Sequence, residues 1–179
     1  MNRKHSIATA AEALFAGRGY DQASTQMIAK EAGVSEALIF KHFGSKDKLL
    51  TSLIKNGYRR IVENNRGLLH YDDQPLEFVY SLLDLPAKLV AEEPRFWEMQ
   101  YRLIDLPASM TEHQRFLQPV NTLLVKSFKA LGYAQPKEET QLLLTLVDAL
   151  WKQEVVQGSG TTRPLSELMK QKYRNMNLS

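Results

Sequence analysis

The sequence predicts an all-α protein. Apolar residues recur at spacings of three and four along nearly the whole chain, as on one face of an amphipathic helix. The alternation of apolar and polar residues that marks strands is absent. Glycines and prolines fall where the periodic segments begin or end. We expect a three-helix domain of residues 1–47, followed by a helical bundle of residues 48–179.

Four helices are expected in the N-terminal third of the chain. Their predicted ranges are 3–16, 24 or 25 to 33, 36–43 and 46–66. Gly17 and Gly19 end the first, Gly33 ends the second, and Gly44 precedes the fourth. The apolar pattern of the fourth helix predicts that its inward residues are Leu49, Leu50, Leu53, Ile54, Ile61 and Val62.

A connector at residues 71–75 leads into the bundle. Pro75 and Pro94 suit the first turn of a helix, whereas Pro86 and Pro107 are predicted to end or kink the helices they follow. These last two prolines lie in two short segments of similar sequence, 80–87 and 101–108, which we call the echoed segments. We interpret them as two helices that end alike or as a chance similarity. Further helices are expected at 118–131, 138–157 and 164–174, with a break at 158–160.

Composition and charge narrow the function classes. The apolar share of 44% and charged share of 24% are typical of a soluble globular protein, and the chain contains no cysteine, which excludes disulfides and thiolate-bound metals. No apolar stretch is long enough to span a membrane, so we expect a cytoplasmic protein. Residues 1–66 carry 11 basic and 6 acidic side chains, against 12 and 14 in the remainder. This uneven charge predicts a polyanion contact near the N-terminus.

Residues 25–43 have the pattern of a helix-turn-helix. Ile28, Ala29 and Ala32 form the buried face of one short helix, which the Thr25 hydroxyl is predicted to cap. Gly33 supplies the left-handed residue that a tight turn requires, Val34 fills the corner and Ser35 is predicted to cap the next helix. Ile39 and Phe43 hold that second helix to the core. Such a unit places its second helix in the major groove of double-stranded DNA.

Here the chain resembles the N-terminal domain of TetR-family regulators. The matching stretches, which agree in order and spacing, are 15–25, 28–29, 32–35, 40–43 and 45–49. Residues 146–151, Leu-Val-Asp-Ala-Leu-Trp, look like a dimerisation helix of some members. The resemblance implies a homodimeric repressor that binds a near-palindromic DNA operator and is released by a small-molecule effector. The helices at 118–131 and 138–157 are expected to pair with their symmetry mates.

The resemblance also suggests roles for individual residues at the DNA. Thr25 and Lys46, at helix N-termini, and Lys41 and His42 are expected to approach phosphates. Gln26, Glu36 and Ala37 match positions that reach base edges, where Gln suits adenine, Glu suits cytosine and Ala suits the thymine methyl. Ser35 and Phe40 complete the predicted DNA-contacting set, although the family usually has Tyr at the position of Phe40 and a small polar residue at that of Leu38.

Simpler structural roles compete with several of these assignments. For Glu36, a favourable charge at a helix N-terminus is an equal alternative to base contact, and solvated charge is the alternative for Lys41 and Lys46. An ordinary histidine without a functional contact is the alternative for His42.

Aromatic side chains of the bundle supply a candidate ligand pocket. The predicted lining residues are Phe78, Trp97, Tyr101 and Trp151, for each of which plain core packing is the commoner alternative. The four histidines are too far apart for a metal site, no enzyme signature is present, and no cofactor is expected. The competing function is a DNA-anchored protein-interaction module without a ligand pocket.

Overall fold

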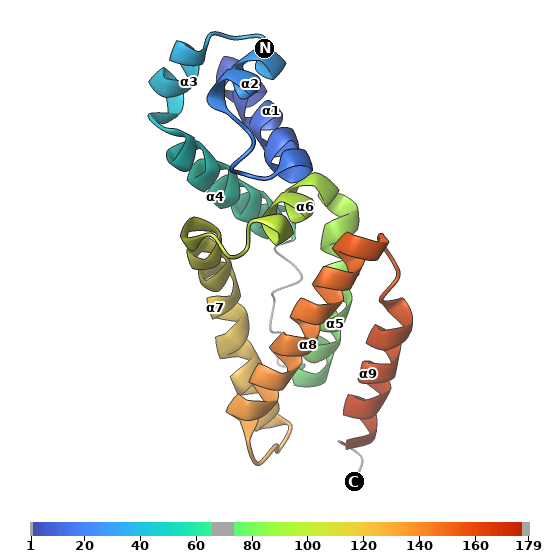
Figure 1. The fold of residues 1–179 in the computed structure, drawn as a ribbon. Coiled ribbons are helices and arrows are strands. Elements are labelled where there is room, and N and C mark those ends of the chain that lie inside the picture. The colour runs from blue at the N-terminus through green and yellow to red at the C-terminus, as the bar shows by residue number, and fades with distance from the viewer. Residues whose placement is uncertain (1, 66–73, 177–179) are drawn as a thin grey trace. The chain divides into compact units, whose positions relative to one another are not determined.

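The computed structural model describes residues 2–65 and 74–176. Within these residues the backbone forms nine helices and no strand (Figure 1), which confirms the predicted all-α class. The chain divides into two compact units, residues 1–61 with 95–114 and residues 62–94 with 115–179. The predicted domain of residues 1–47 lies entirely within the first unit.

The first unit is built on a three-helix core to which parts of three further helices are added. In this core α1 packs against both α2 and α3. The buried apolar side chains include Ile7, Phe15, Ile28, Ile39 and Leu49. Ile28, Ala29 and Ile39 are buried as predicted, whereas Ala32, Val34 and Phe43 are half-buried. The helices of this unit are α1 (Arg3–Arg18), α2 (Thr25–Ala32), α3 (Glu36–Phe43), most of α4 (Lys46–Asn64), most of α6 (Pro94–Arg102) and the N-terminal part of α7 (Pro107–Ala130).

Two predicted helix caps differ from the structure. The cap of α2 is Ser24, whose Oγ accepts a hydrogen bond from the backbone N–H of Met27 at 3.2 Å. Thr25 is already inside the helix, whereas Ser24 has the extended backbone that a capping side chain requires. Ser35 occupies the cap position of α3, but its hydroxyl makes no capping bond.

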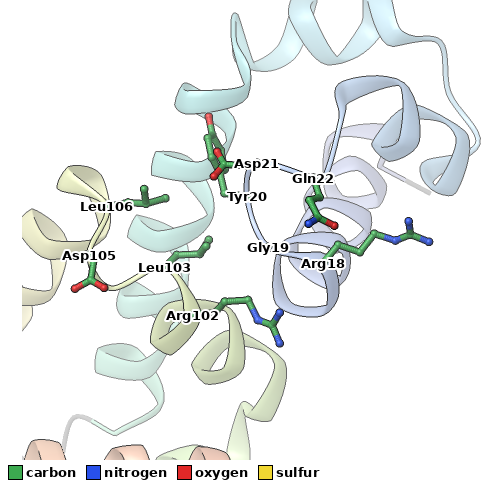
Figure 2. A pocket seen from close by; sticks show the side chains of 9 residues that line it. All are labelled: Arg18, Gly19, Tyr20, Asp21, Gln22, Arg102, Leu103, Asp105 and Leu106. Atoms are coloured by element: carbon green, nitrogen blue, oxygen red, sulfur yellow. The ribbon is translucent and has the colours of Figure 1, made fainter.

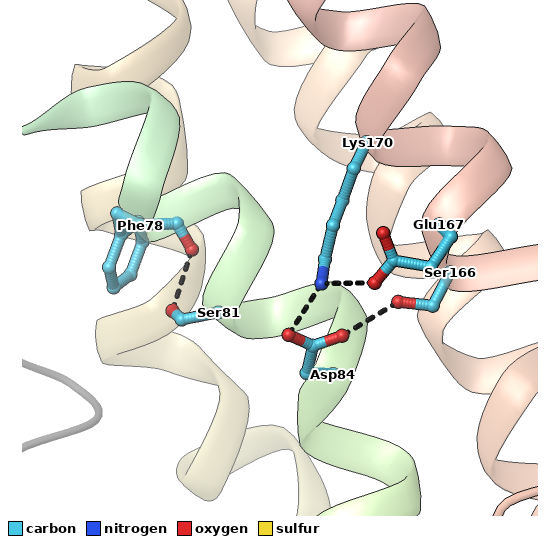
Figure 3. Close-up of polar contacts among 6 residues, drawn as sticks. All are labelled: Phe78, Ser81, Asp84, Ser166, Glu167 and Lys170. Carbon is cyan, nitrogen blue, oxygen red and sulfur yellow. Dashed lines mark hydrogen bonds and ion pairs between the residues drawn. The ribbon is translucent and has the colours of Figure 1, made fainter. Parts of the chain in front are cut away.

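The second unit is a bundle in which α5 packs against α8 and α9. A polar network fastens α5 to α9 (Figure 3): Asp84 accepts hydrogen bonds from Ser166 Oγ at 2.8 Å and from Lys170 Nζ at 2.6 Å. Lys170 also contacts Glu167 at 3.0 Å. The helices are α5 (Pro75–Glu92), the C-terminal part of α7 (Pro107–Ala130), α8 (Pro136–Gln157) and α9 (Arg163–Met176).

A fully buried carboxylate organises the turn between α8 and α9. Glu154 accepts hydrogen bonds from the backbone N–H groups of Gly160 and Thr162 and from the Thr162 hydroxyl. The predicted break at residues 158–160 is therefore an ordered turn. Its backbone donors are satisfied by a side chain of the preceding helix, which removes the cost of burying a polar group without a partner.

The prolines of the echoed segments behave differently from the prediction. Helix α5 does not end at Pro86 but continues to Glu92, because buried residues on both sides of the proline, among them Leu83 and Leu89, hold it in the core. Pro107 is the first residue of α7, after α6 has ended at Arg102. The two similar segments are thus helix interior in one case and a helix end, turn and helix start in the other.

Other boundaries shift as well. Helix α4 ends at Asn64, and Arg66 and residues 71–73 of the predicted connector lie outside the described residues. Val62, predicted to face inward, is 40% exposed because it follows the last buried turn of α4. The helix predicted at 118–131 is the second half of the longer helix α7, which contains Pro119.

Gly57 of α4 permits close packing of an aromatic ring. A Cβ atom at this position would lie 2.0 Å from Cε2 of Phe96, which is itself buried and packs against Tyr58 and Trp97. We expect Gly57→Ala to lower the free energy of unfolding by about 1–3 kcal/mol, because overpacking outweighs the ~1 kcal/mol gain in helix propensity. Thermal or urea unfolding measures the change.

Gly17 provides the matched control, since it also lies in a helix but has no atom within 4 Å of an added Cβ. Gly17→Ala should leave stability unchanged or raise it by up to about 1 kcal/mol. Equal effects of the two substitutions would contradict the packing explanation.

Candidate nucleic-acid interface

The turn between α2 and α3 sets the direction of the exposed helix. Gly33 has left-handed backbone angles, φ 65° and ψ 37°, and its N–H donates to the carbonyls of Ala29 and Lys30. The N–H of Val34 donates to Ala29 O at 3.0 Å, which closes the end of α2. Burial of Ile39 then fixes which face of α3 points outward.

The predicted contact residues gather on the surface of this helix pair. Lys41 and His42 are exposed near the end of α3, and Phe40 is 46% exposed. The full set comprises the exposed residues Gln26, Ser35, Ala37, Phe40, Lys41 and His42 and the half-buried residues Thr25, Glu36 and Lys46. Their role in binding DNA stays a prediction.

Two of these residues are bonded to each other. The Thr25 hydroxyl donates to Oε1 of Glu36 at 2.5 Å, so the first residue of α2 is linked to the first residue of α3. The bond engages the single hydroxyl proton of Thr25 in this structure.

Lys46 contacts an aromatic ring. Its Nζ lies 4.2 Å from the ring centroid of Tyr20, whose hydroxyl donates to Asp47. Burial of the ring and this hydrogen bond raise the pKa of Tyr20 above its usual range, so the phenol keeps its proton at neutral pH. Tyr20 and Asp47 thereby hold the start of α4 to the turn after α1. Sequence reasoning missed this pair because 27 residues separate its members.

The predicted ligand-lining residues divide between the two units. Trp97 and Tyr101 are on α6 in the first unit, where Trp97 is buried against Tyr58 and Phe96. Phe78 and Trp151 are buried in the second unit. None of the four lines either of the two cavities described next.

A cavity of about 270 Å³ lies in the first unit between the turn after α1 and the segment after α6 (Figure 2). Its charged lining residues are Arg18, Asp21, Arg102 and Asp105, and Arg102 Nη1 reaches the carbonyl of Gly17 at 3.4 Å. A second cavity of about 440 Å³ lies in the second unit beside the Asp84 network. Both are lined by several charged and polar side chains, and Tyr20 in the first cavity is the one aromatic residue among their lining residues.

Residues 2–65 and 74–176 contain no cluster of three or more His, Cys, Asp or Glu side chains that is able to hold a metal ion. Within those ranges, no helix is both long and apolar enough to cross a membrane.

Residues 7–53 match the family model described as "Bacterial regulatory proteins, tetR family". The matched range contains α2 and α3 and all nine predicted contact residues.

Curated relatives match over different lengths. The HTH-type transcriptional regulator HbdR of Aromatoleum sp. (strain CIB) is 44% identical over 54 residues, 30% of this chain and 24% of its own length. The HTH-type transcriptional repressor AcnR of Corynebacterium efficiens is 29% identical over 54% of this chain and 55% of its own length. The nucleoid occlusion factor SlmA of Aliivibrio fischeri is 28% identical over 82% of this chain and 79% of its own. The chain thus spans less than two thirds of the first two relatives.

The fold is also found in solved structures. The transcriptional regulator FadR from Bacillus subtilis, solved in complex with stearoyl-CoA, aligns with a TM-score of 0.74 and 18% identity. The alignment covers 94% of this chain and 96% of that one. The family-model match and the names of the relatives identify residues 7–53 as a DNA-binding domain of the TetR-family type, and the solved structure shares the fold of nearly the whole chain.

Proposed function

We propose that this regulator is a homodimeric repressor that binds a near-palindromic operator and is released by a small-molecule effector. The exposed face of α3 carries the proposal, because a buried Ile39 fixes the helix while Lys41 and His42 remain available to a polyanion. Two such helices in a dimer would meet successive major grooves roughly 34–36 Å apart.

The contacts with DNA divide into backbone and base contacts. Lys41 and His42 are proposed to bind phosphates from the end of α3, and Gln26 and Ala37, both exposed, to face base edges. Phe40 presents a ring without a hydroxyl, so it offers apolar contact only. Lys46 is proposed to bind phosphate from above the Tyr20 ring, which orients its ammonium group.

The proposed dimer surface is formed by α8 and α9. On α8, the exposed residues Leu142, Thr145, Ala149 and Val156 are spaced by three, four and seven and so share one face. Leu165 and Leu168 of α9 are 44% and 49% exposed. A second copy of the chain is the proposed occupant, because members of this family dimerise. Apart from Pro119 and Ala130, the apolar residues of segment 118–131 are buried or half-buried, which favours α9 over α7 as the partner of α8.

The proposals of repression and of release by an effector are supported by the names of two similar proteins and by thermodynamic linkage. AcnR is named a repressor, and the B. subtilis FadR was solved with stearoyl-CoA. For this chain we propose an effector that binds the DNA-free form more tightly than the DNA-bound form, because only a difference in affinity shifts the equilibrium. Of the residues predicted from the sequence to contact it, Phe78 and Trp151 lie in the second unit and Trp97 and Tyr101 in the first.

A DNA-anchored protein-interaction module is the second candidate function. The match to the nucleoid occlusion factor SlmA over 158 residues favours it, since this match extends well beyond the DNA-binding domain. Such a module would bind DNA without response to small molecules.

Lys41→Ala should weaken DNA binding to all sequences alike and reduce the slope of log K against log salt by about 2, because each protomer of the dimer loses one phosphate contact. Titration of labelled DNA at several salt concentrations measures both. Lys137→Ala, which removes an exposed lysine of α8, is the control that should change neither. An unchanged salt slope for Lys41→Ala would refute the phosphate contact.

Leu142→Glu or Leu168→Glu should raise the dimer dissociation constant by at least about 100-fold, because a carboxylate would be buried without a partner at the interface. Sedimentation or light scattering over a concentration range measures the change. Met110→Glu alters an equally exposed apolar residue, 45% exposed, on α7 and should leave the dimer intact. Intact dimers for both α8 and α9 variants would exclude this surface.

An effector that binds tightly should lower operator affinity by about 5- to 150-fold. A long-chain acyl-CoA is the first probe, and operator binding is measured with and without it. If every ligand that binds tightly leaves operator affinity unchanged, release by an effector is wrong and the interaction module is favoured. The chain has two tryptophans, so Trp97→Phe and Trp151→Phe separate their fluorescence responses to the ligand.

A further inference from the structure

The hydrogen bond between Thr25 and Glu36 joins the two helices of the DNA-binding unit at their N-terminal ends. Both side chains are half-buried, and the bond crosses from α2 to α3 over a sequence separation of 11 residues. Within the part of the chain that the structure describes, Thr25 is the only side chain that contacts the Glu36 carboxylate by a hydrogen bond or ion pair. One carboxylate oxygen is therefore bonded to Thr25, and the other has no hydrogen bond or ion pair to a side chain of the described residues.

The position of Glu36 is where a recognition helix meets bases. The N-terminal residues of such a helix contact base edges in the major groove. Ala37, the next residue, is exposed, so no bulky neighbour on that side covers the start of α3. An ionised carboxylate in this place accepts hydrogen bonds and donates none.

The hydrogen-bonding groups that each base presents in the major groove select one partner for the carboxylate. In the major groove cytosine presents the N4 amino donor, guanine presents the acceptors N7 and O6, and thymine presents the acceptor O4 and a methyl group. Adenine offers an N6 donor, but its neighbouring N7 acceptor repels a carboxylate. A carboxylate fixed in the groove thus favours cytosine and disfavours the other three bases.

We propose that Glu36 determines specificity for a cytosine in each operator half-site and that Thr25 is the positioning residue that orients its carboxylate. The inference rests on the proposed function, in which α3 enters the major groove. It changes the role of Thr25 from a phosphate contact to a support for base recognition, because the Thr25 hydroxyl proton is already bonded to Glu36.

Selection of bound sites from a randomised DNA pool tests the role of Glu36. Wild-type protein should select one cytosine per half-site, and Glu36→Gln should replace it with adenine, because a Gln amide pairs with N6 and N7 of adenine. The affinity of the variant for the wild-type site should fall about 5- to 100-fold. Glu63→Gln removes the same charge from an exposed position on α4 and should keep the wild-type motif.

Thr25 is tested by a pair of substitutions. Thr25→Val keeps the shape but removes the donor, so the preference for cytosine over other bases at that position should drop several-fold, whereas Thr25→Ser should retain it. Thermal unfolding of each variant verifies that the domain remains folded.

The outcomes distinguish a failure of the roles assigned to Thr25 and Glu36 from a failure of the proposed function. Uniformly weaker binding of Thr25→Val with an unchanged motif would assign Thr25 to phosphate and overturn its positioning role. An unchanged motif for Glu36→Gln would leave Glu36 as a helix-terminal charge and overturn the inference alone. Selection of no sequence by the wild-type protein would overturn the proposed function as well.

Discussion

The left-handed turn at Gly33 is the constraint on which the DNA-binding unit depends. It ends α2, returns two N–H groups to the carbonyls of that helix, and starts α3 in a direction that lets Ile39 enter the core. Any residue with a Cβ is strained in this conformation. Because Ile39 is fully buried, the rotation of α3 is fixed, and the exposed positions of Ala37 and Lys41 follow from it.

Polar contacts refine a geometry that apolar packing has already set. Thr25 ties the start of α2 to Glu36, and Tyr20 ties the turn after α1 to Asp47 at the start of α4. Each link joins a loop or helix end that buried side chains alone would leave free to fray. The two links involve or adjoin three residues of the predicted DNA surface, so the same bonds that connect the helices also set the positions of these side chains.

The second unit uses polar contacts where helices must be joined. Asp84 links α5 to α9, and Glu154 supplies the acceptors for the turn that separates α8 from α9. With α5 packed against both helices, the apolar residues Leu142, Val156 and Leu168 are left on the outside. These residues belong to the surface proposed above for the dimer.

The sequence by itself determined the all-α class, the glycine turn and the buried positions Ile28 and Ile39, because these depend on local periodicity and on backbone conformations that glycine adopts readily. Only the tertiary structure decided that Ser24 rather than Thr25 caps α2 and that Thr25 bonds to Glu36. The echoed segments 80–87 and 101–108 show why local sequence could not decide such details. Similar residues form helix interior in the first segment and include a turn in the second. Contacts distant in sequence outweigh a local preference of a few kcal/mol, and those contacts exist only once the chain has folded.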